Sequence, residues 1–161
     1  MHYIIRVMKT EAEVGKILRK CKMTMAVAES CTGGLISSRI TDISGSSDYF
    51  IMGIVAYSNK IKENILGVSP RLLQKHGAVS KQVALEMAKG VSLLAATDIG
   101  IGVTGIAGPT GGTKSKPVGL VYIALVTDKK HLVKGFRFKG PREDIKFQAS
   151  QSALEMIIKN I

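Results

Sequence analysis

The chain has 161 residues, with 23 lysines and arginines against 12 acidic residues, which gives a net charge of +11. This length suits one domain with its own hydrophobic core. A hydrophobic fraction of 45% with 22% charged residues is typical of a globular protein and excludes a disordered chain. The two cysteines and three histidines are too few and too scattered for a zinc site, so we expect no metal and no cofactor.

No apolar run in the sequence approaches the ~18 residues of a membrane span, and the first residues lack the long apolar stretch of a secretory signal. A cytoplasmic location without a membrane partner is therefore expected. The positive charge suits a nucleic-acid binder, but basic residues are spread over nearly every segment and aromatic residues are few. We interpret most of the charge as solvated surface, which makes a nucleic-acid-binding module the weakest functional hypothesis.

The first third of the chain predicts a helix, a strand and a second helix. A capping box at residues 10–13 predicts that the first helix begins there. The short apolar run of residues 25–28 predicts a buried strand, and residues 35–43 have helical spacing. The turn between them holds Ser30 and Thr32 at the carboxyl edge of the predicted sheet, where open α/β folds bind ligands. The alternative is an ordinary turn, with one of these side chains as the helix N-cap.

The middle of the chain predicts two strands separated by helices. In residues 50–57, apolar side chains occupy both the odd and the even positions, which predicts a strand covered on both faces. Helices are expected over residues 59–66, 70–76 and 80–95, and the last of these is the most clearly amphipathic. Residues 99–103 predict a strand of small residues, whose glycines allow a helix or ligand to approach closely.

The last third predicts a functional loop, a hairpin and a helix. Residues 104–117 are too long and too rich in glycine to be a mere connector. Strands over residues 118–126 and 131–138 predict a hairpin, and a last helix begins at Arg142. The chain is therefore expected to form an α/β fold, a three-layer α/β/α sandwich with a mixed sheet, as a single domain over residues 1–161.

Three polar turns at strand ends, residues 29–34, 57–62 and 104–116, are expected to converge on one pocket. None of them contains a histidine, so a Ser-His-Asp triad has little support. A serine activated by a lysine stays open, because desolvation or a nearby cation lowers the pKa of a lysine until it acts as a base. The candidate hydroxyls and cations are Ser30, Thr32, Ser47, Tyr57, Thr104, Lys60, Lys62, Lys114, Lys116 and Arg142.

Five short motifs occur in order along the chain. They are Ala28-Glu29-Ser30-Cys31-Thr32-Gly33-Gly34, Tyr57-Ser58-Asn59 with Lys62, His76-Gly77-Ala78-Val79-Ser80, Thr104-Gly105-Ile106-Ala107-Gly108-Pro109, and Gly140 with Arg142. From about residue 10 to the end, these motifs resemble the C-terminal domain family of the competence-damage protein CinA. The characterised enzymes of that family are nicotinamide-nucleotide amidohydrolases.

The resemblance implies that water cleaves the carboxamide of nicotinamide mononucleotide. The products are nicotinate mononucleotide and ammonia, in pyridine-nucleotide salvage. The family is understood to use a Ser/Lys pair without a metal, and family analogy favours a homo-oligomer. The alternative is a non-catalytic protein that binds a nucleotide in the same pocket.

Four residues match family positions for the reaction itself. Lys62 would take the proton from a serine hydroxyl and return it to the departing ammonia, and Tyr57 would hold that proton path in line. Ser30 and Ser47 both match serines of the family pattern. We favour Ser47 as the nucleophile and Ser30 as a supporting hydrogen-bond partner, and the reverse assignment stays open.

The residues expected to bind the substrate are Thr32, Gly33, Gly34, Thr104, Gly105 and Arg142. The first three lie at a helix start, whose backbone N–H groups would bind an anion. Thr104 and the glycine after it would face the carboxamide oxygen or the phosphate. Arg142 would contact the phosphate with two N–H groups.

Overall fold

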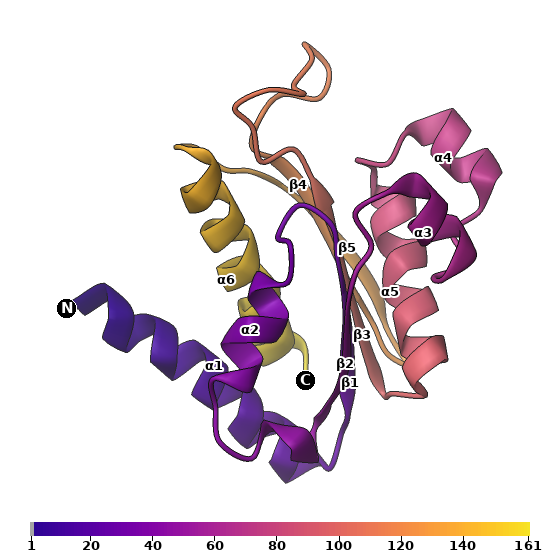
Figure 1. Cartoon of the computed structure of the whole chain (residues 1–161). Coiled ribbons are helices and arrows are strands. Elements are labelled where there is room, and N and C mark those ends of the chain that lie inside the picture. Colours follow the sequence, from indigo (N-terminus) through magenta and orange to yellow (C-terminus); the bar gives the residue numbers. More distant parts are fainter. Residues whose placement is uncertain (1) are drawn as a thin grey trace.

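The computed structural model describes the backbone of residues 2–161 and the side chains of residues 10–161. Five strands form one mixed sheet in the order β2-β1-β3-β4-β5 (Figure 1). The parallel part consists of β2 (Phe50–Val55), β1 (Met25–Glu29) and β3 (Ile99–Gly105). The antiparallel part continues through β4 (Leu120–Val126) and β5 (His131–Arg137).

Helices cover both faces of this sheet, which confirms the predicted three-layer α/β/α sandwich. One face carries α1 (His2–Cys21), α2 (Leu35–Thr41) and α6 (Arg142–Asn160) (Figure 1). The other face carries α3 (Asn59–Asn64), α4 (Pro70–His76) and α5 (Lys81–Ala95). A single 3-10 turn, η1 (Ser46–Asp48), precedes β2. No helix in the described chain is long and apolar enough to cross a membrane.

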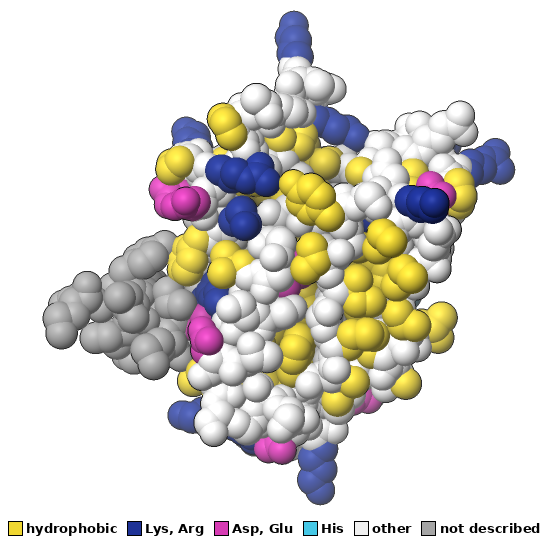
Figure 2. Space-filling view, viewed as in Figure 1, with side chains coloured by type: hydrophobic (Ala, Val, Ile, Leu, Met, Phe, Trp, Pro, Cys, Tyr) yellow, Lys and Arg dark blue, Asp and Glu magenta, His cyan; other side chains and the backbone are white. Residues whose placement is uncertain are grey.

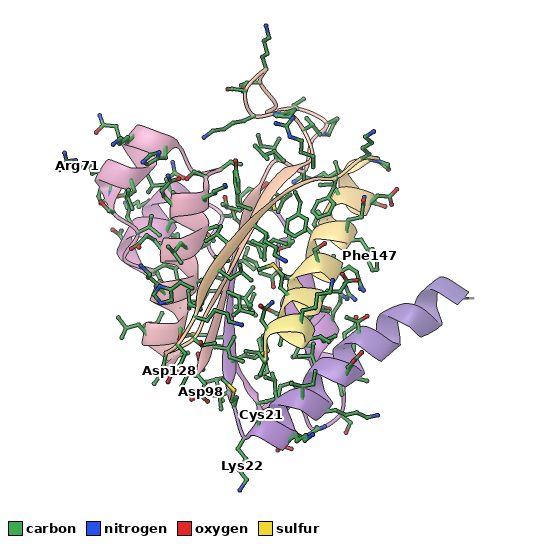
Figure 3. All side chains as sticks on the ribbon, turned by 180° about the vertical axis from the view of Figure 1, so that it is seen from behind. Cys21, Lys22, Arg71, Asp98, Asp128 and Phe147 are labelled. Atoms are coloured by element: carbon green, nitrogen blue, oxygen red, sulfur yellow. The ribbon has the colours of Figure 1, made fainter. Side chains whose placement is uncertain are left out.

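The central strand β1 is buried along its whole length. Met25 and Val27 pack in the hydrophobic core beneath α1, α2 and α6. Side chains of the sheet and of α6 fill the space between the sheet and this helix (Figure 3). Ala26 and Ala28 face the opposite core beneath α5. Because β1, β2 and β3 are parallel, their carboxyl ends meet at one edge of the sheet.

The glycines of β3 allow α5 to lie directly against the sheet, as predicted. A Cβ atom at Gly100 would lie 2.1 Å from the carbonyl oxygen of Ala88, and one at Gly102 would lie 2.3 Å from that of Ala84. Real Cβ atoms do not approach backbone this closely, so neither position accepts a side chain without a shift of the helix. This close packing fixes the end of β3 relative to the start of α5.

Two predictions about these elements were wrong, one about where the first helix begins and one about how β2 is covered. The first helix does not begin at the capping box, because the helix already runs from His2, and Thr10 is a buried residue within it. The strand β2 is not covered on both faces, because it lies at the edge of the sheet. Its exposure alternates along the chain, with Ile51 at 51% and Val55 at 48% exposed.

Candidate active site

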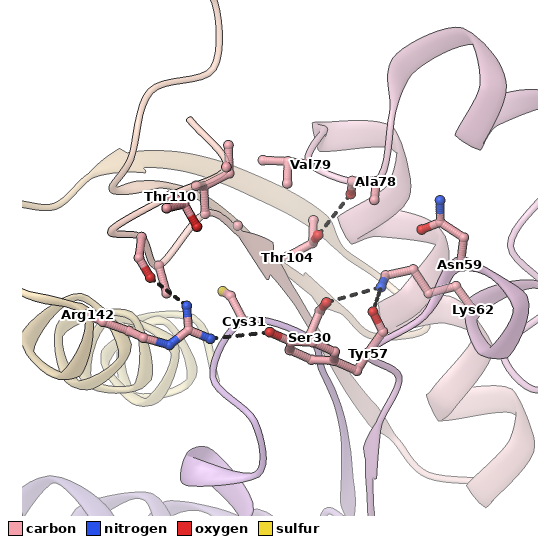
Figure 4. A pocket seen from close by; sticks show the side chains of 15 residues that line it. Ser30, Cys31, Tyr57, Asn59, Lys62, Ala78, Val79, Thr104, Thr110 and Arg142 are labelled. Carbon is pink, nitrogen blue, oxygen red and sulfur yellow. Dashed lines mark hydrogen bonds between the residues drawn. The ribbon is translucent and has the colours of Figure 1, made fainter. Parts of the chain in front are cut away.

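A pocket of about 340 Å³ opens at the edge of the sheet where β1, β2 and β3 end (Figure 4). All three predicted turns contribute to its lining, together with Arg142 at the start of α6. The pocket is also lined by Ala78 and Val79, which precede α5. Parallel strand ends therefore bring residues from five distant parts of the chain together.

Ser30 and Lys62 form the centre of this pocket. Ser30 follows β1, and its backbone N–H donates to the carbonyl of Val103 on β3 at 3.0 Å. The Nζ of Lys62, from α3, lies 3.0 Å from the Oγ of Ser30 (Figure 4). The same Nζ donates to the carbonyl oxygens of Ala56 at 2.7 Å and Tyr57 at 3.3 Å. Three acceptors therefore surround one amine.

Lys62 is only 1% exposed, and no carboxylate among the described side chains pairs with it. Burial lowers the pKa of Lys62, because removal from water disfavours the charged amine. Desolvation is one of the two causes that the sequence suggested, the other being a neighbouring cation. A neutral amine keeps two N–H groups for the two carbonyls and directs its lone pair at the Ser30 hydroxyl. The arrangement suits a base for that serine.

Arg142 and Tyr57 form the rim of the pocket on the α6 side. The guanidinium of Arg142 donates to the carbonyl oxygen of Gly108 at 2.6 Å and to the hydroxyl of Tyr57 at 3.2 Å (Figure 4). Tyr57 is 63% exposed. Its backbone carbonyl oxygen accepts a hydrogen bond from Lys62, whereas its hydroxyl accepts one from Arg142.

Thr104 and Gly105 line the wall formed by the end of β3. Thr104 is buried, and its Oγ1 donates to the carbonyl oxygen of Ala78 at 2.8 Å (Figure 4). This bond joins β3 to the segment before α5. Because the hydroxyl proton is used in it, Thr104 offers a substrate its remaining acceptor capacity.

The start of α2, where Thr32, Gly33 and Gly34 were expected to bind the substrate, does not line this pocket. The carboxylate of Glu29 occupies the place expected for a bound anion. It accepts the N–H groups of Gly34 and Ile36, both at 3.1 Å, and the N–H of Ser37 at 2.9 Å. The free donors of the helix start are thus already satisfied by a residue of the chain itself.

Ser47 lies in η1 and is exposed. This turn is at the amino end of β2, whereas Lys62 lies beyond its carboxyl end. A strand of this length spans about 20 Å, so one strand length separates the two residues. Ser47 does not line the pocket. Within the chain, Ser30 and not the preferred Ser47 contacts Lys62, because the order of the elements puts Ser47 at the other end of the strand.

Cys31 is the remaining candidate nucleophile in the pocket. Burial raises the pKa of its thiol to about 12, so the reactive thiolate is not formed near neutral pH. Among the described residues, no group of three or more histidine, cysteine or acidic side chains is placed to hold a metal ion. The serine next to Lys62 is thus the hydroxyl best placed to react.

Residues 7–161 match the CinA C-terminal domain family. The chain belongs to this family. The putative competence-damage inducible protein of Moorella thermoacetica is 52% identical over 151 residues, which cover 94% of this chain and 36% of that protein. A CinA-like protein of Koribacter versatilis is 50% identical over 151 residues, with 94% and 36% covered. This chain thus spans little more than a third of the length of such relatives.

Solved structures of the CinA superfamily have the same fold. The competence/damage inducible protein of Agrobacterium tumefaciens matches with a TM-score of 0.93 and 37% identity, over 95% of this chain and 94% of that one. The competence damage-inducible protein A of Klebsiella pneumoniae also matches with a TM-score of 0.93, at 32% identity and 96% coverage of both chains. The family expected from the motifs is confirmed.

Two residues of this CinA-family site were missed in the sequence. Glu29 stands at the end of an apolar strand, directly before a glycine-rich helix start, and this position of a lone carboxylate was the available signal. Asn59 lines the pocket as the first residue of α3. The helix is capped by Ser58, whose hydroxyl accepts the N–H of Ile61 at 3.2 Å.

Proposed function

We propose that this CinA-family protein is a serine amidohydrolase with Ser30 as nucleophile and Lys62 as general base. The observation that carries the proposal is the 3.0 Å contact between a hydroxyl and a buried amine whose pKa is lowered. The substrate, nicotinamide mononucleotide, is taken from the family resemblance. A small pyridine nucleotide as ligand, a cytoplasmic location and a homo-oligomer belong to the same proposal.

The first half of the reaction transfers the acyl group to the enzyme. The neutral amine of Lys62 takes the proton of the Ser30 hydroxyl while the oxygen attacks the carboxamide carbon. The resulting ammonium of Lys62 then gives this proton to the amide nitrogen. The carbon–nitrogen bond breaks, ammonia leaves, and a nicotinoyl ester remains on Ser30.

The second half of the reaction restores the enzyme. Lys62, neutral again, takes a proton from a water molecule that attacks the ester carbon. The bond to the Ser30 oxygen breaks, and the proton returns to that oxygen. The products are the free serine and nicotinic acid mononucleotide, whose carboxyl group then gives its proton to ammonia or water and becomes nicotinate, so no second titrating side chain is needed.

Donors for the negative charges of substrate and transition state come from the loop after β3. The backbone N–H groups of Ala107, Gly108 and Gly111 donate to no acceptor in the described part of the chain, and these residues line the pocket. Arg142 uses two of its five N–H groups for Gly108 and Tyr57. Its remaining donors are available for the phosphate of the substrate. In this orientation the phosphate binds at the rim of the pocket and the amide lies at Ser30.

The test is the release of ammonia from nicotinamide mononucleotide. Lys62→Ala is expected to lose at least about 100-fold in kcat, because a general base contributes on this scale. Lys129→Ala, on an exposed turn, is the matched control and should keep the wild-type rate. Full activity of Lys62→Ala would refute the mechanism. Binding of the nucleotide by the wild type without ammonia release would indicate the non-catalytic alternative.

A further inference from the structure

Asn59 lies next to Lys62 in the pocket. It is the first residue of α3, and Lys62 follows three residues later on the same helix. Residues three apart on a helix lie on one face, with Cβ atoms about 5–6 Å apart. Both side chains line the pocket, and Figure 4 shows Asn59 on the side of the pocket where the Lys62 amine lies. A carboxamide of the protein is therefore close to the proposed base.

The carboxamide of Asn59 is free to bind a ligand. The cap of α3 is the Ser58 hydroxyl, so the helix does not need this side chain. Within residues 10–161, the Asn59 side chain forms neither a hydrogen bond nor an ion pair, and it is exposed. Its oxygen can accept hydrogen bonds from a molecule in the pocket, and its two N–H groups can donate to one.

Other polar groups of the pocket are already engaged or lie elsewhere. In its neutral form, Lys62 uses both N–H groups for carbonyl oxygens and directs its lone pair at Ser30. Thr110 also lines the pocket, but it lies on the side of Arg142 (Figure 4). Of the described side chains near Lys62, that of Asn59 keeps both an acceptor and donors for a ligand.

Arg142 lies on the opposite side of the pocket, at the start of α6. Arg142 and Lys146 are one turn apart on this helix. Figure 2 shows Lys and Arg side chains gathered beside the start of α6, whereas hydrophobic side chains gather over β2 and α3. A ligand that carries a phosphate is expected to place it on the side of these cations. Its amide then points towards Ser30 and α3, where Asn59 lies.

The leaving nitrogen of the substrate needs an acceptor besides Lys62. When Ser30 attacks the carboxamide carbon, this nitrogen becomes tetrahedral and has one lone pair and two N–H groups. The lone pair must face the ammonium of Lys62 to take its proton. An acceptor that holds one of the N–H groups keeps the lone pair in that direction. The Asn59 oxygen suits this role because it is neutral, whereas a carboxylate there would raise the pKa of Lys62.

We propose that the side-chain oxygen of Asn59 accepts an N–H group of the substrate carboxamide and orients the leaving nitrogen towards Lys62. The inference rests on the proposed function and makes Asn59 a specificity-determining residue of the same site. An ester of the same acid has no N–H group at its leaving oxygen, so it gains nothing from this contact. Asn59 thus favours amides over esters.

The first test compares kcat/KM for nicotinamide mononucleotide with kcat/KM for the methyl ester of nicotinate mononucleotide. Asn59→Leu removes the acceptor and should lower the amide value by at least about 10-fold, the scale of one lost hydrogen bond, and leave the ester value unchanged. Asn64→Leu, at an exposed asparagine of the same helix outside the pocket, is the matched control and should change neither. Equal losses on amide and ester in Asn59→Leu, or no loss on either, would overturn the inference.

The second test uses Asn59→Asp, which keeps an acceptor oxygen but adds a negative charge beside Lys62. The ratio of the amide value to the ester value should stay close to that of the wild type. The charge favours the ammonium of Lys62, so activity should appear at a higher pH than in the wild type. An unshifted pH profile, or a ratio as low as that of Asn59→Leu, would contradict the proposed contact.

These outcomes separate the inference from the proposed function. If the wild type releases ammonia and Asn59→Leu keeps the wild-type ratio, the amidohydrolase stands and the role of Asn59 is wrong. If the wild type releases no ammonia from nicotinamide mononucleotide, both the proposed function and the role of Asn59 are wrong.

Discussion

Lys62 illustrates how one residue couples stability to chemistry. Its ammonium form is buried with three hydrogen bonds and no counter-charge, so the folded state holds the proton less tightly than the unfolded chain. A lowered pKa is also what the proposed role of Lys62 as a general base requires. The charged form of Lys62 therefore lowers the free energy of unfolding, and the neutral form is the one that the proposed reaction needs.

This coupling predicts a pH dependence of stability. The pKa of Lys62 is lowered from 10.5 in the folded state, so the unfolded chain binds more protons between the two values. Stability of the wild type therefore rises with pH in that window relative to Lys62→Met, by at most ~1.4 kcal/mol per pH unit. Urea unfolding at a series of pH values measures the difference. A difference that is flat with pH, like that expected for exposed Lys129→Met, would argue against the lowered pKa.

Glu29 stabilises the turn that carries Ser30. Its fully buried carboxylate accepts four hydrogen bonds from the start of α2, including one from the Ser37 hydroxyl at 2.8 Å. Glu29→Gln replaces one acceptor oxygen with a donor and should lower the free energy of unfolding by about 1–3 kcal/mol. Chemical denaturation measures this loss, with exposed Glu13→Gln as the control. Equal stability of the two variants would show that the carboxylate is not needed.

At the scale of elements, the contact between α5 and β3 fixes the back wall of the pocket. Gly102→Ala would put a Cβ atom 2.3 Å and 2.6 Å from backbone atoms of Ala84 and Ala88. We expect a loss of about 3 kcal/mol by denaturation, because backbone cannot move aside as a side chain can. Gly67→Ala is the control, since its Cβ would meet nothing within 4 Å and only its positive φ costs about 1 kcal/mol. A smaller loss at Gly102 than at Gly67 would contradict this close packing.

Most elements were predictable because their signals are local. The serine cap and apolar stripe of α5, the proline start of α4 and the glycines of β3 all lie within the segments that they shape. The position of β2 was not predictable in this way. Apolar residues at both its odd and its even positions suited a central strand. Strand order, however, depends on packing between distant segments, and β2 lies at an edge of the sheet.

At the scale of the whole molecule, a buried polar network connects three helices on one face of the sheet. Arg39 on α2 forms an ion pair with Glu11 on α1, and their side chains are 5% and 3% exposed. Arg39 also donates to Ser150 and Gln151 on α6, both at 2.7 Å. Because its partners come from two other helices, Arg39 holds this layer together.

Breaking this network should be costly. Arg39→Met is expected to lower the free energy of unfolding by about 3–5 kcal/mol, because it leaves the Glu11 carboxylate buried without its partner. The double variant with Glu11→Leu should lose less than the sum of the two single losses. Lys159→Met removes an exposed ion pair of 3.6 Å with Glu155 and should cost less than about 1 kcal/mol. Additive losses in the double variant would contradict a coupled network.

The segments that form the candidate site could be predicted from the sequence, but the serine that contacts Lys62 could not. The three turns, Lys62 and Arg142 carry recognisable residue types in the sequence. The choice between Ser30 and Ser47 could not be made there, because both adjoin a turn and a strand. Only the direction of β2 in the folded sheet decides which of them lies near Lys62.

The most direct test compares ammonia release from nicotinamide mononucleotide by Ser30→Ala and Ser47→Ala. The contact of 3.0 Å between the Lys62 amine and the Ser30 hydroxyl predicts that Ser30→Ala loses at least about 100-fold in kcat. Ser47→Ala should retain most of the wild-type rate. The reverse order, with Ser30→Ala active and Ser47→Ala inactive, would contradict the assignment of Ser30 as the nucleophile.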